Sequence, residues 1–149
     1  MDGSKFTQKS IQAVGRLQSL AEEYGTQEIC EEHLLYALLT QDDSLILKLV
    51  ERMEINKEYY VNRVLSEIEK KPKVSGGEPY VGEHLRRALN AAEGIAKQMG
   101  DEYVSVEHLM LSMIEHPSAE MKDILKEFGI TKILNFNNHT IFGKEYGFY

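Results

Sequence analysis

The segment from Gly100 to Ile114, GDEYVSVEHLMLSMI, decides the fold because the chain has already used its pattern once. The segment from Gly25 to Leu39, GTQEICEEHLLYALL, carries the same leading glycine, an aliphatic fifth residue and the same Glu-His-Leu, each seventy-five positions earlier. The same offset relates Ala13 to Ala88, Ala21 to Ala96 and Ile55 to Ile130. One offset that holds without a gap over about 50 residues indicates an internal duplication.

Each copy of the unit is predicted to be helical. In the first copy, apolar residues recur every three or four positions in four segments, which is typical of helices with one buried face. The first helix is predicted to begin after an N-cap at Thr7 and to end at Gly25, and others to cover Leu34–Leu39, about Ser44–Met53 and about Lys57–Lys70. The buried faces are expected to hold Ile11, Val14, Leu17, Leu20, Ala21 and Tyr24, then Leu34, Leu35, Leu38 and Leu39, then Leu45, Leu49, Val50 and Met53, and finally Tyr60, Val61, Val64, Leu65 and Ile68.

The second copy repeats this plan. Its first helix is predicted to end at Gly100, and its next helix to begin at Ser105, whose hydroxyl is a good N-cap. Cys30 stands at the equivalent position of the first copy and is a weak cap. The predicted organisation is all-α: a first repeat over 1–71, an exposed connector rich in Pro, Gly and Ser over 72–79, a second repeat over 80–132 and a tail of undefined structure over 133–149. Each repeat is expected to hold about four helices, related by a pseudo-twofold axis.

The composition narrows the possible functions. With 42% hydrophobic and 28% charged residues, the 149-residue chain is predicted to fold as a globular domain. A net charge of −7 argues against nucleic acid as a partner. No apolar run approaches the roughly 20 residues that cross a bilayer, the first residues do not form a secretory signal, and the single Cys30 cannot make an internal disulfide. These features predict a cytoplasmic location and no membrane partner.

The sequence carries none of the catalytic motifs GxxxxGK[ST], HExxH, CxxC or GxSxG. We therefore expect no enzyme activity, cofactor or metal in this chain. His33 and His108 follow a Glu at equivalent positions, which permits a metal or acid–base role, but no third ligand stands at metal spacing. The pattern favours histidines that pack at helix starts and bond the neighbouring loop. Cys30 is either a reactive thiol or a small, half-buried residue.

The duplicated helical unit, together with FTQKSIQAV from Phe6 and KKPKVSGGEPY from Lys70, resembles the N-terminal domain of the Clp ATPases from about Lys5 to Lys132. The connector and the GDEY segment are more similar to ClpB disaggregases than to ClpC unfoldases. The resemblance implies an all-α double repeat that serves as a non-catalytic module of a larger hexameric protein. In that protein, ATP and Mg²⁺ bind to separate AAA+ rings. An isolated domain of this kind is expected to be a monomer.

The resemblance also implies a site for unfolded or aggregated polypeptide. The matching residues are Thr7, Asp101 and Glu107, beside an apolar groove that includes Leu89 and Ile95. This chain has His108 where relatives can carry a leucine, and Ala91 where a larger apolar residue can sit. Both differences predict a shallower or more polar groove. Thr7, Asp101 and Glu107 equally suit structural roles at turns and helix starts.

Two alternatives stay open. In ClpC-type proteins, paired glutamates engage phosphorylated arginine and the same domain docks adaptor proteins; Glu32 and Glu107 are the matching pair here. The second alternative is that the chain is a free-standing regulator of a Clp machine. The tail after Lys132, ILNFNNHTIFGKEYGFY, departs from the charged helix of the family and has the pattern of a truncated product or a divergent tail. Its aromatic residues Phe142, Tyr146, Phe148 and Tyr149 would be sticky if exposed.

Overall fold

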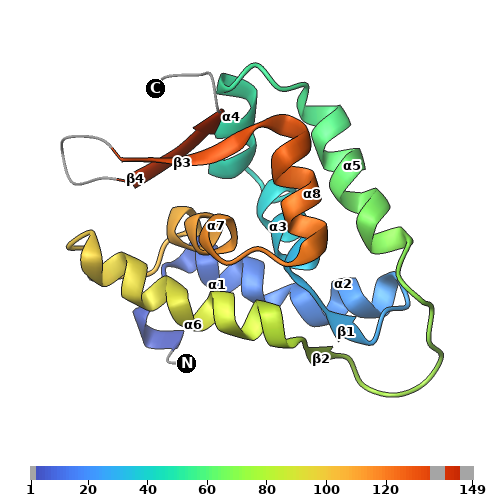
Figure 1. The fold of residues 1–149 in the computed structure, drawn as a ribbon. Coiled ribbons are helices and arrows are strands. Elements are labelled where there is room, and N and C mark those ends of the chain that lie inside the picture. Colours follow the sequence, from blue (N-terminus) through green and yellow to red (C-terminus); the bar gives the residue numbers. More distant parts are fainter. Residues whose placement is uncertain (1–2, 135–139, 145–149) are drawn as a thin grey trace.

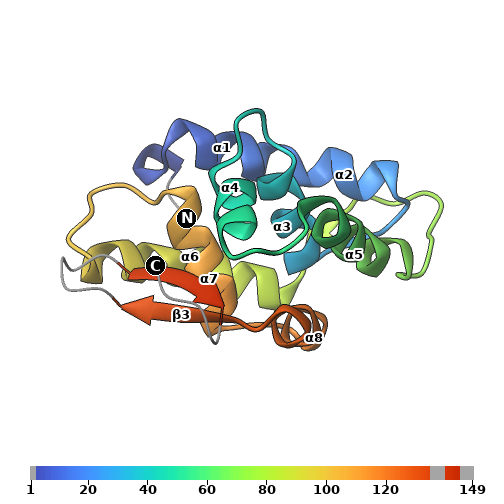
Figure 2. The ribbon, with the colours of Figure 1, turned by 90° about the horizontal axis from the view of Figure 1, so that it is seen from above.

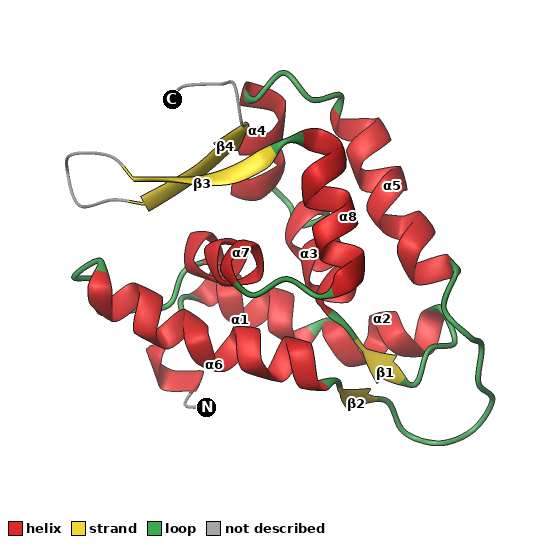
Figure 3. Cartoon of the chain, viewed as in Figure 1, coloured by secondary structure: helices red, strands yellow, loops and turns green. Residues whose placement is uncertain are grey.

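The computed structural model describes residues 3–134 and 140–144, and helices make up most of this part of the chain (Figures 1 and 3). In chain order the elements are η1 (Gly3–Lys5), α1 (Gln8–Gly15), α2 (Leu17–Glu23), β1 (Glu28–Ile29), α3 (Glu31–Leu39), α4 (Leu45–Arg52), α5 (Lys57–Glu69), β2 (Tyr80–Val81), α6 (Glu83–Gln98), α7 (Val106–Glu115), α8 (Ala119–Phe128), β3 (Ile130–Leu134) and β4 (Thr140–Lys144). The all-α class is confirmed. None of the described helices combines the length and the apolar character that a membrane-spanning helix requires.

The first repeat contains the predicted helices, with one division. The stretch expected to form one helix is divided into α1 and α2, which meet at Arg16 directly after Gly15. Thr7 caps α1 as predicted, because its Oγ1 accepts a hydrogen bond from the Ser10 amide. The prediction that Ile11 is buried was wrong: the face of α1 that turns inward holds Ser10 and Ala13.

Helix α4 is turned relative to the predicted face. Val50 and Met53 are buried as predicted and Ile46 is buried as well, whereas Leu45 is exposed and Leu49 only half-buried. The N-cap residue Ser44 is itself buried, since its hydroxyl donates to the carbonyl of Leu38 in addition to capping the helix. The core-facing row of α4 therefore runs through Ile46 and Val50, which are also a helical turn apart.

Two short β contacts express the pseudo-twofold symmetry. Strand β1 pairs in parallel with β2, and the amide of Gly82 donates to the carbonyl of Ile29 at 2.9 Å. Seventy-five residues away, the amide of Thr7 donates to the carbonyl of Val104 at 3.0 Å. Thr7 and Gly82 are equivalent residues, and so are Ile29 and Val104. The loop before α3 in the first repeat thus pairs with the segment that leads into α6 in the second repeat. In the same way, the loop before α7 in the second repeat pairs with the segment that leads into α1 in the first.

The central helices α3 and α7 join the two repeats into one core. Helix α3 touches α1, α2, α4 and α5 of its own repeat and α6, α7 and α8 of the other (Figure 2). Both central helices are apolar on nearly every side, as expected for helices enclosed by others. Their buried apolar side chains are Leu34, Leu35, Ala37, Leu38, Leu39, Val106, Leu109, Met110, Leu111 and Met113.

The second repeat departs from the predicted plan after its third helix. Gly129 adopts a left-handed conformation (φ 65°) that ends α8, and the chain continues as the antiparallel hairpin β3–β4. By the offset of the duplication, residues 132–144 correspond to α5, so this hairpin takes the place that α5 has in the first repeat, mostly within the tail whose structure the sequence left undefined. β-Branched residues recur in both strands of the hairpin, and such residues favour extended structure. The prediction for the side chains of Tyr146, Phe148 and Tyr149 lies outside the described residues, and for Phe142 the structure describes only the backbone.

The connector is exposed, as predicted, and it is anchored to the first repeat. The amide of Val74 donates to the carbonyl of Gly25 at 2.8 Å, and the ammonium group of Lys73 donates to the carbonyl of Tyr24 at 2.7 Å. These bonds hold the connector beside β1 and β2. The duplication therefore creates two related places where the repeats meet. We name them the N-terminal junction (residues 5–7, the loop 100–105 and the first turn of α7) and the connector junction (β1, β2, the connector and the first turn of α8).

Candidate functional site

The N-terminal junction brings Thr7 next to the segment that contains Asp101 and Glu107, more than ninety residues later in the chain. The amide of Thr7 bonds the carbonyl of Val104, and the amide of Val104 bonds the carbonyl of Lys5 at 2.7 Å. This places Thr7 against the loop that contains Asp101 and leads into the first turn of α7, where Glu107 lies. All three predicted residues are half-buried and so keep part of their surface toward solvent. They belong to one edge of the molecule.

His108 connects Asp101 to the start of α7. The ring is buried; its Nε2 lies 2.8 Å from Oδ2 of Asp101, and its Nδ1 accepts the amide hydrogen of Ser105 at 2.8 Å. Because Nδ1 accepts, the neutral ring carries its proton on Nε2 and donates it to the carboxylate. The hydroxyl of Ser105 accepts from the amide of His108 at 3.4 Å, which completes a reciprocal cap. His108 therefore fixes the carboxylate of Asp101 at this edge.

His33 makes the same contacts in the first repeat. Its Nδ1 accepts the amide hydrogen of Cys30 at 2.9 Å, and its Nε2 lies 2.9 Å from the hydroxyl of Thr26, which replaces Asp101. Burial, followed by the charge of the Lys71 ammonium group, lowers the pKa of His33 to about 4. Both histidines bond the loop before their helix, as predicted. Among the described residues, no group of three His, Cys, Asp or Glu side chains is placed to hold a metal ion.

The thiol of Cys30 does not have the surroundings of a reactive cysteine. It donates a weak hydrogen bond to the carbonyl of Glu28 at 3.8 Å. Burial raises the pKa of Cys30 to about 11, against the lowering effect of Lys71. A thiol with a raised pKa is rarely in its nucleophilic thiolate form. The interpretation of Cys30 as a small structural residue is therefore the better one.

The apolar residues predicted for the groove lie deeper than expected. Leu89 and Ile95 belong to α6 and are buried in the common core rather than on open walls. Ala91, from the same helix, instead lines a hollow of about 380 Å³ with His84, Arg87, His116 and Pro117. The substrate-binding role of Leu89 and Ile95 stays a prediction. In this structure the N-terminal junction presents Thr7, Asp101 and Glu107 together with the more exposed Glu102 and Tyr103.

The two glutamates that the resemblance pairs are not in equivalent surroundings. Glu32 is fully buried and its Oε2 lies 2.8 Å from the ammonium nitrogen of Lys71. Its counterpart Glu107 is half-buried in the first turn of α7. Beside Glu32, the buried Glu31 accepts the amide hydrogen of Ser118 at 2.7 Å, and burial raises its pKa to about 7. In the first repeat, Glu31 and Glu32 therefore make buried contacts with Ser118 and Lys71. The equivalent residues of the second repeat, Val106 and Glu107, have no such contacts among the described residues.

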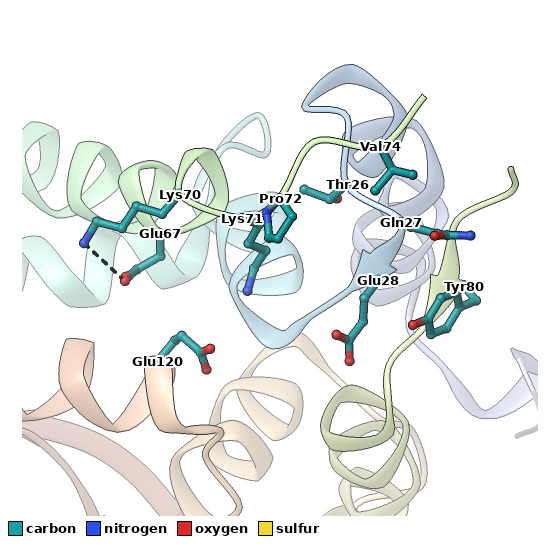
Figure 4. A pocket seen from close by; sticks show the side chains of 10 residues that line it. All are labelled: Thr26, Gln27, Glu28, Glu67, Lys70, Lys71, Pro72, Val74, Tyr80 and Glu120. Atoms are coloured by element: carbon teal, nitrogen blue, oxygen red, sulfur yellow. Dashed lines mark ion pairs between the residues drawn. The ribbon is translucent and has the colours of Figure 1, made fainter. Parts of the chain in front are cut away.

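A pocket that sequence reasoning missed lies at the connector junction. Its volume is about 550 Å³, and its walls come from the loop around β1, the end of α5, the connector, β2 and the first turn of α8 (Figure 4). Glu28, Lys71 and Glu120 point toward the same space. These residues are far apart in the sequence, and no local pattern marks them. The one available signal was the duplication itself, because its offset makes the residues of this junction equivalent to those of the N-terminal junction around Thr7.

Comparison with known proteins agrees with the geometry. Residues 5–128 match the family described as the Clp repeat (R) N-terminal domain. The chain belongs to this family. The Clp repeat domain is 38% identical over 138 residues to the chaperone protein ClpB of Nitratidesulfovibrio vulgaris, and 38% identical over 134 residues to that of Porphyromonas gingivalis. These matches cover 89% and 90% of the chain but only 16% and 15% of the two relatives.

Solved structures share the fold. The Hsp104 N-terminal domain from Candida albicans superposes with a TM-score of 0.73 at 25% identity, over 83% of this chain and 81% of that one. The ClpV N-domain in complex with a VipB peptide superposes with a TM-score of 0.65 at 17% identity, over 83% of this chain and 78% of that one. The double Clp repeat is thus the architecture of this chain, and the described relatives carry it as a domain of larger proteins.

Proposed function

We propose that this Clp repeat domain is the non-catalytic, client-binding N-terminal module of a ClpB-like disaggregase, and that it engages unfolded or aggregated polypeptide at the N-terminal junction. The observation that carries the proposal is the pairing of Thr7 with Val104, which sets Thr7 on one edge with Asp101 and Glu107. Two supports are the ClpB relatives, which match nearly the whole chain, and the peptide named with the ClpV N-domain. ATP and Mg²⁺ binding and hexamer assembly would reside in other domains of such a protein, which we expect in the cytoplasm.

The chemistry of this edge suits an extended polypeptide. Asp101 and Glu107 offer carboxylate oxygens that accept hydrogen bonds from the unpaired amides of a client, and the hydroxyl of Thr7 adds a further polar contact. With Leu89 and Ile95 below the surface, the apolar area that this edge leaves open for burial comes mainly from Tyr103, which is 48% exposed. A few hundred Å² at roughly 25 cal/mol/Å², less the cost of association, predicts weak and promiscuous binding. Weak binding allows a client to be passed on, and several domains in one assembly would add avidity.

The phosphoarginine alternative has less support in this chain. It requires a glutamate from each repeat to receive a guanidinium group. Glu32 is fully buried and already holds the ammonium group of Lys71, so only Glu107 is accessible. Adaptor docking by the rest of the surface is the alternative that our experiment must separate from client binding.

A two-dimensional NMR titration with a permanently unfolded, apolar polypeptide tests the proposal. We expect the largest shifts at Thr7, Asp101 and Glu107, and weaker binding in the variant Asp101→Asn with Glu107→Gln. The matched control is Glu23→Gln with Glu58→Gln, which removes the same number of carboxylates from exposed positions on α2 and α5. Binding that leaves these three resonances unmoved would contradict the proposal and would favour adaptor docking.

A further inference from the structure

The pocket at the connector junction has a surplus of negative charge. Its two lysines are each engaged by a glutamate of their own: Lys71 by the buried Glu32 at 2.8 Å, and Lys70 by Glu67 at 3.6 Å. Glu28 and Glu120 face the same space, and no ion pair is found for either carboxylate within the described residues (Figure 4). One of them comes from each repeat. A cation entering the pocket would therefore meet two carboxylates that make no ion pair of their own, with the ammonium group of Lys71, which Glu32 holds, as the nearby positive charge.

An apolar edge borders this pocket. Val74, Tyr80 and Val81 are three of the seven large hydrophobic residues that the described part of the chain exposes, at 45%, 55% and 42% of their surface. The duplication supplies a comparison, because Phe6, the counterpart of Val81 at the N-terminal junction, is only 6% exposed. The apolar side chain that is covered at this position of the N-terminal junction is thus left open at the connector junction, whereas Tyr103 is the large hydrophobic residue that the N-terminal junction exposes, at 48%. The bond from Val74 to Gly25 holds the edge in place.

We infer that the connector junction is a second client-binding pocket, which takes a lysine or arginine side chain that neighbours an apolar residue in an extended polypeptide. The inference rests on the proposed function, since it assumes that the domain binds polypeptide. The cationic head lies between Glu28 and Glu120 while its alkyl stem packs on Tyr80, and the neighbouring apolar side chain packs on Val74. The net charge of −7 attracts such segments over longer distances.

Two unstructured, fluorescently labelled peptides test this pocket. They share one apolar framework and differ only in whether lysines or glutamates stand between the apolar residues. We expect the lysine peptide to bind more tightly to the wild-type domain. The double variant Glu28→Gln with Glu120→Gln, which keeps side-chain shape, should weaken binding of the lysine peptide about fivefold, as the loss of two partly solvated charge contacts predicts. It should leave the glutamate peptide little affected.

The matched control is Glu23→Gln with Glu58→Gln, which changes the net charge equally at two exposed positions away from the pocket. An equal loss in both double variants would overturn the inference, because the effect would then reflect net charge alone. So would equal affinity for the two peptides. If the lysine peptide shifts only the resonances of Thr7, Asp101 and Glu107, the proposed function stands and the second pocket fails. If neither peptide binds, the proposed function itself fails.

Discussion

The two junctions share one backbone plan and differ in where they place charge. At the N-terminal junction, His108 bonds the carboxylate of Asp101, and the carboxylate stays at the surface. At the connector junction, His33 bonds the neutral hydroxyl of Thr26. The charges nearest the helix start lie inside there, where Glu32 meets Lys71, while Glu28 and Glu120 face the pocket. The duplication has therefore kept the capping histidine, which both central helices need, while the acidic groups around it have diverged.

The largest expected effect comes from breaking the internal ion pair. Lys71→Met leaves the fully buried Glu32 without its cation, which should lower the free energy of unfolding at pH 7 by about 4 kcal/mol. The adjacent variant Lys70→Met is the control: the side chain of Lys70 is 69% exposed, against 15% for Lys71, so its loss should cost under about 0.5 kcal/mol. Urea unfolding measures both.

Adding Glu32→Gln to Lys71→Met removes the uncompensated charge. We expect it to recover a large part of the lost stability, because the double variant no longer holds a buried carboxylate without a partner. If the single variant Lys71→Met is as stable as Lys70→Met, the ion pair of Glu32 and Lys71 contributes nothing to the free energy of unfolding. The two junctions would then differ in the positions of their charged groups but not in how these groups affect stability.

The second prediction concerns pH, because two buried groups of the first repeat oppose each other. The pKa of Glu31 is raised to about 7 in the folded state, so its contribution to stability is present below the unfolded value of 4.5 and is lost as pH rises to 7. The pKa of His33 is lowered to about 4, so its contribution is present above the unfolded value of 6.5 and is lost as pH falls to 4. Between pH 4.5 and 6.5 the contribution of Glu31 to the free energy of unfolding falls with pH while that of His33 rises. The sum of the two contributions should therefore stay nearly constant in this range.

Glu31→Gln should separate these two slopes. The amide still accepts the hydrogen bond from Ser118, but it does not ionise, so the stability of the variant relative to wild type should rise by up to about 3 kcal/mol between pH 5 and pH 8. The equivalent residue of the second repeat is Val106, which cannot titrate. A variant whose difference from wild type does not change with pH would show that Glu31 is already ionised in the folded protein.

The third prediction tests the charged contact of the second repeat. Asp101→Asn keeps the shape of the side chain but replaces the charge-assisted bond to His108 with a neutral one, as in the first repeat. We expect a loss of about 1 kcal/mol in the free energy of unfolding. Thr26→Val, which removes the neutral bond to His33, gives the reference value for the first repeat. A loss for Asp101→Asn that falls clearly below this reference would indicate that Asp101 is kept for binding rather than stability.

The sequence predicted the parts of this structure that depend on local pattern. Apolar spacing located the helices, and the repeated Glu-His-Leu located both capping histidines. The structure after α8 was left undefined by the sequence; the offset aligns these residues with α5, but their β-branched side chains favour a hairpin, so local preference overrode the plan of the duplication. The face of α4 was misplaced because Leu45 and Ile46 are equally apolar and only the position of the buried Ser44 distinguishes them.

The site was less predictable than the fold. Thr7, Asp101 and Glu107 entered through the family resemblance, and the sequence alone could not show that a backbone bond to Val104 brings Thr7 to the loop of Asp101. The pocket of Glu28 and Glu120 was missed, because its residues come from both repeats and meet only after folding. Burial of Glu32 was equally hidden, since a Glu at a helix start is ordinarily solvated.

The smallest expected effect concerns the N-caps that begin the two central helices. Cys30 and Ser105 are equivalent residues, and a hydroxyl accepts a hydrogen bond better than a thiol does. Cys30→Ser should raise the free energy of unfolding by about 0.5 kcal/mol, and Ser105→Cys should lower it by a similar amount. Thermal unfolding of both variants measures the pair. If Cys30→Ser destabilises the protein, the apolar contacts of the sulfur outweigh its poor capping, and the cysteine is then the better residue beside the ion pair of Glu32 and Lys71.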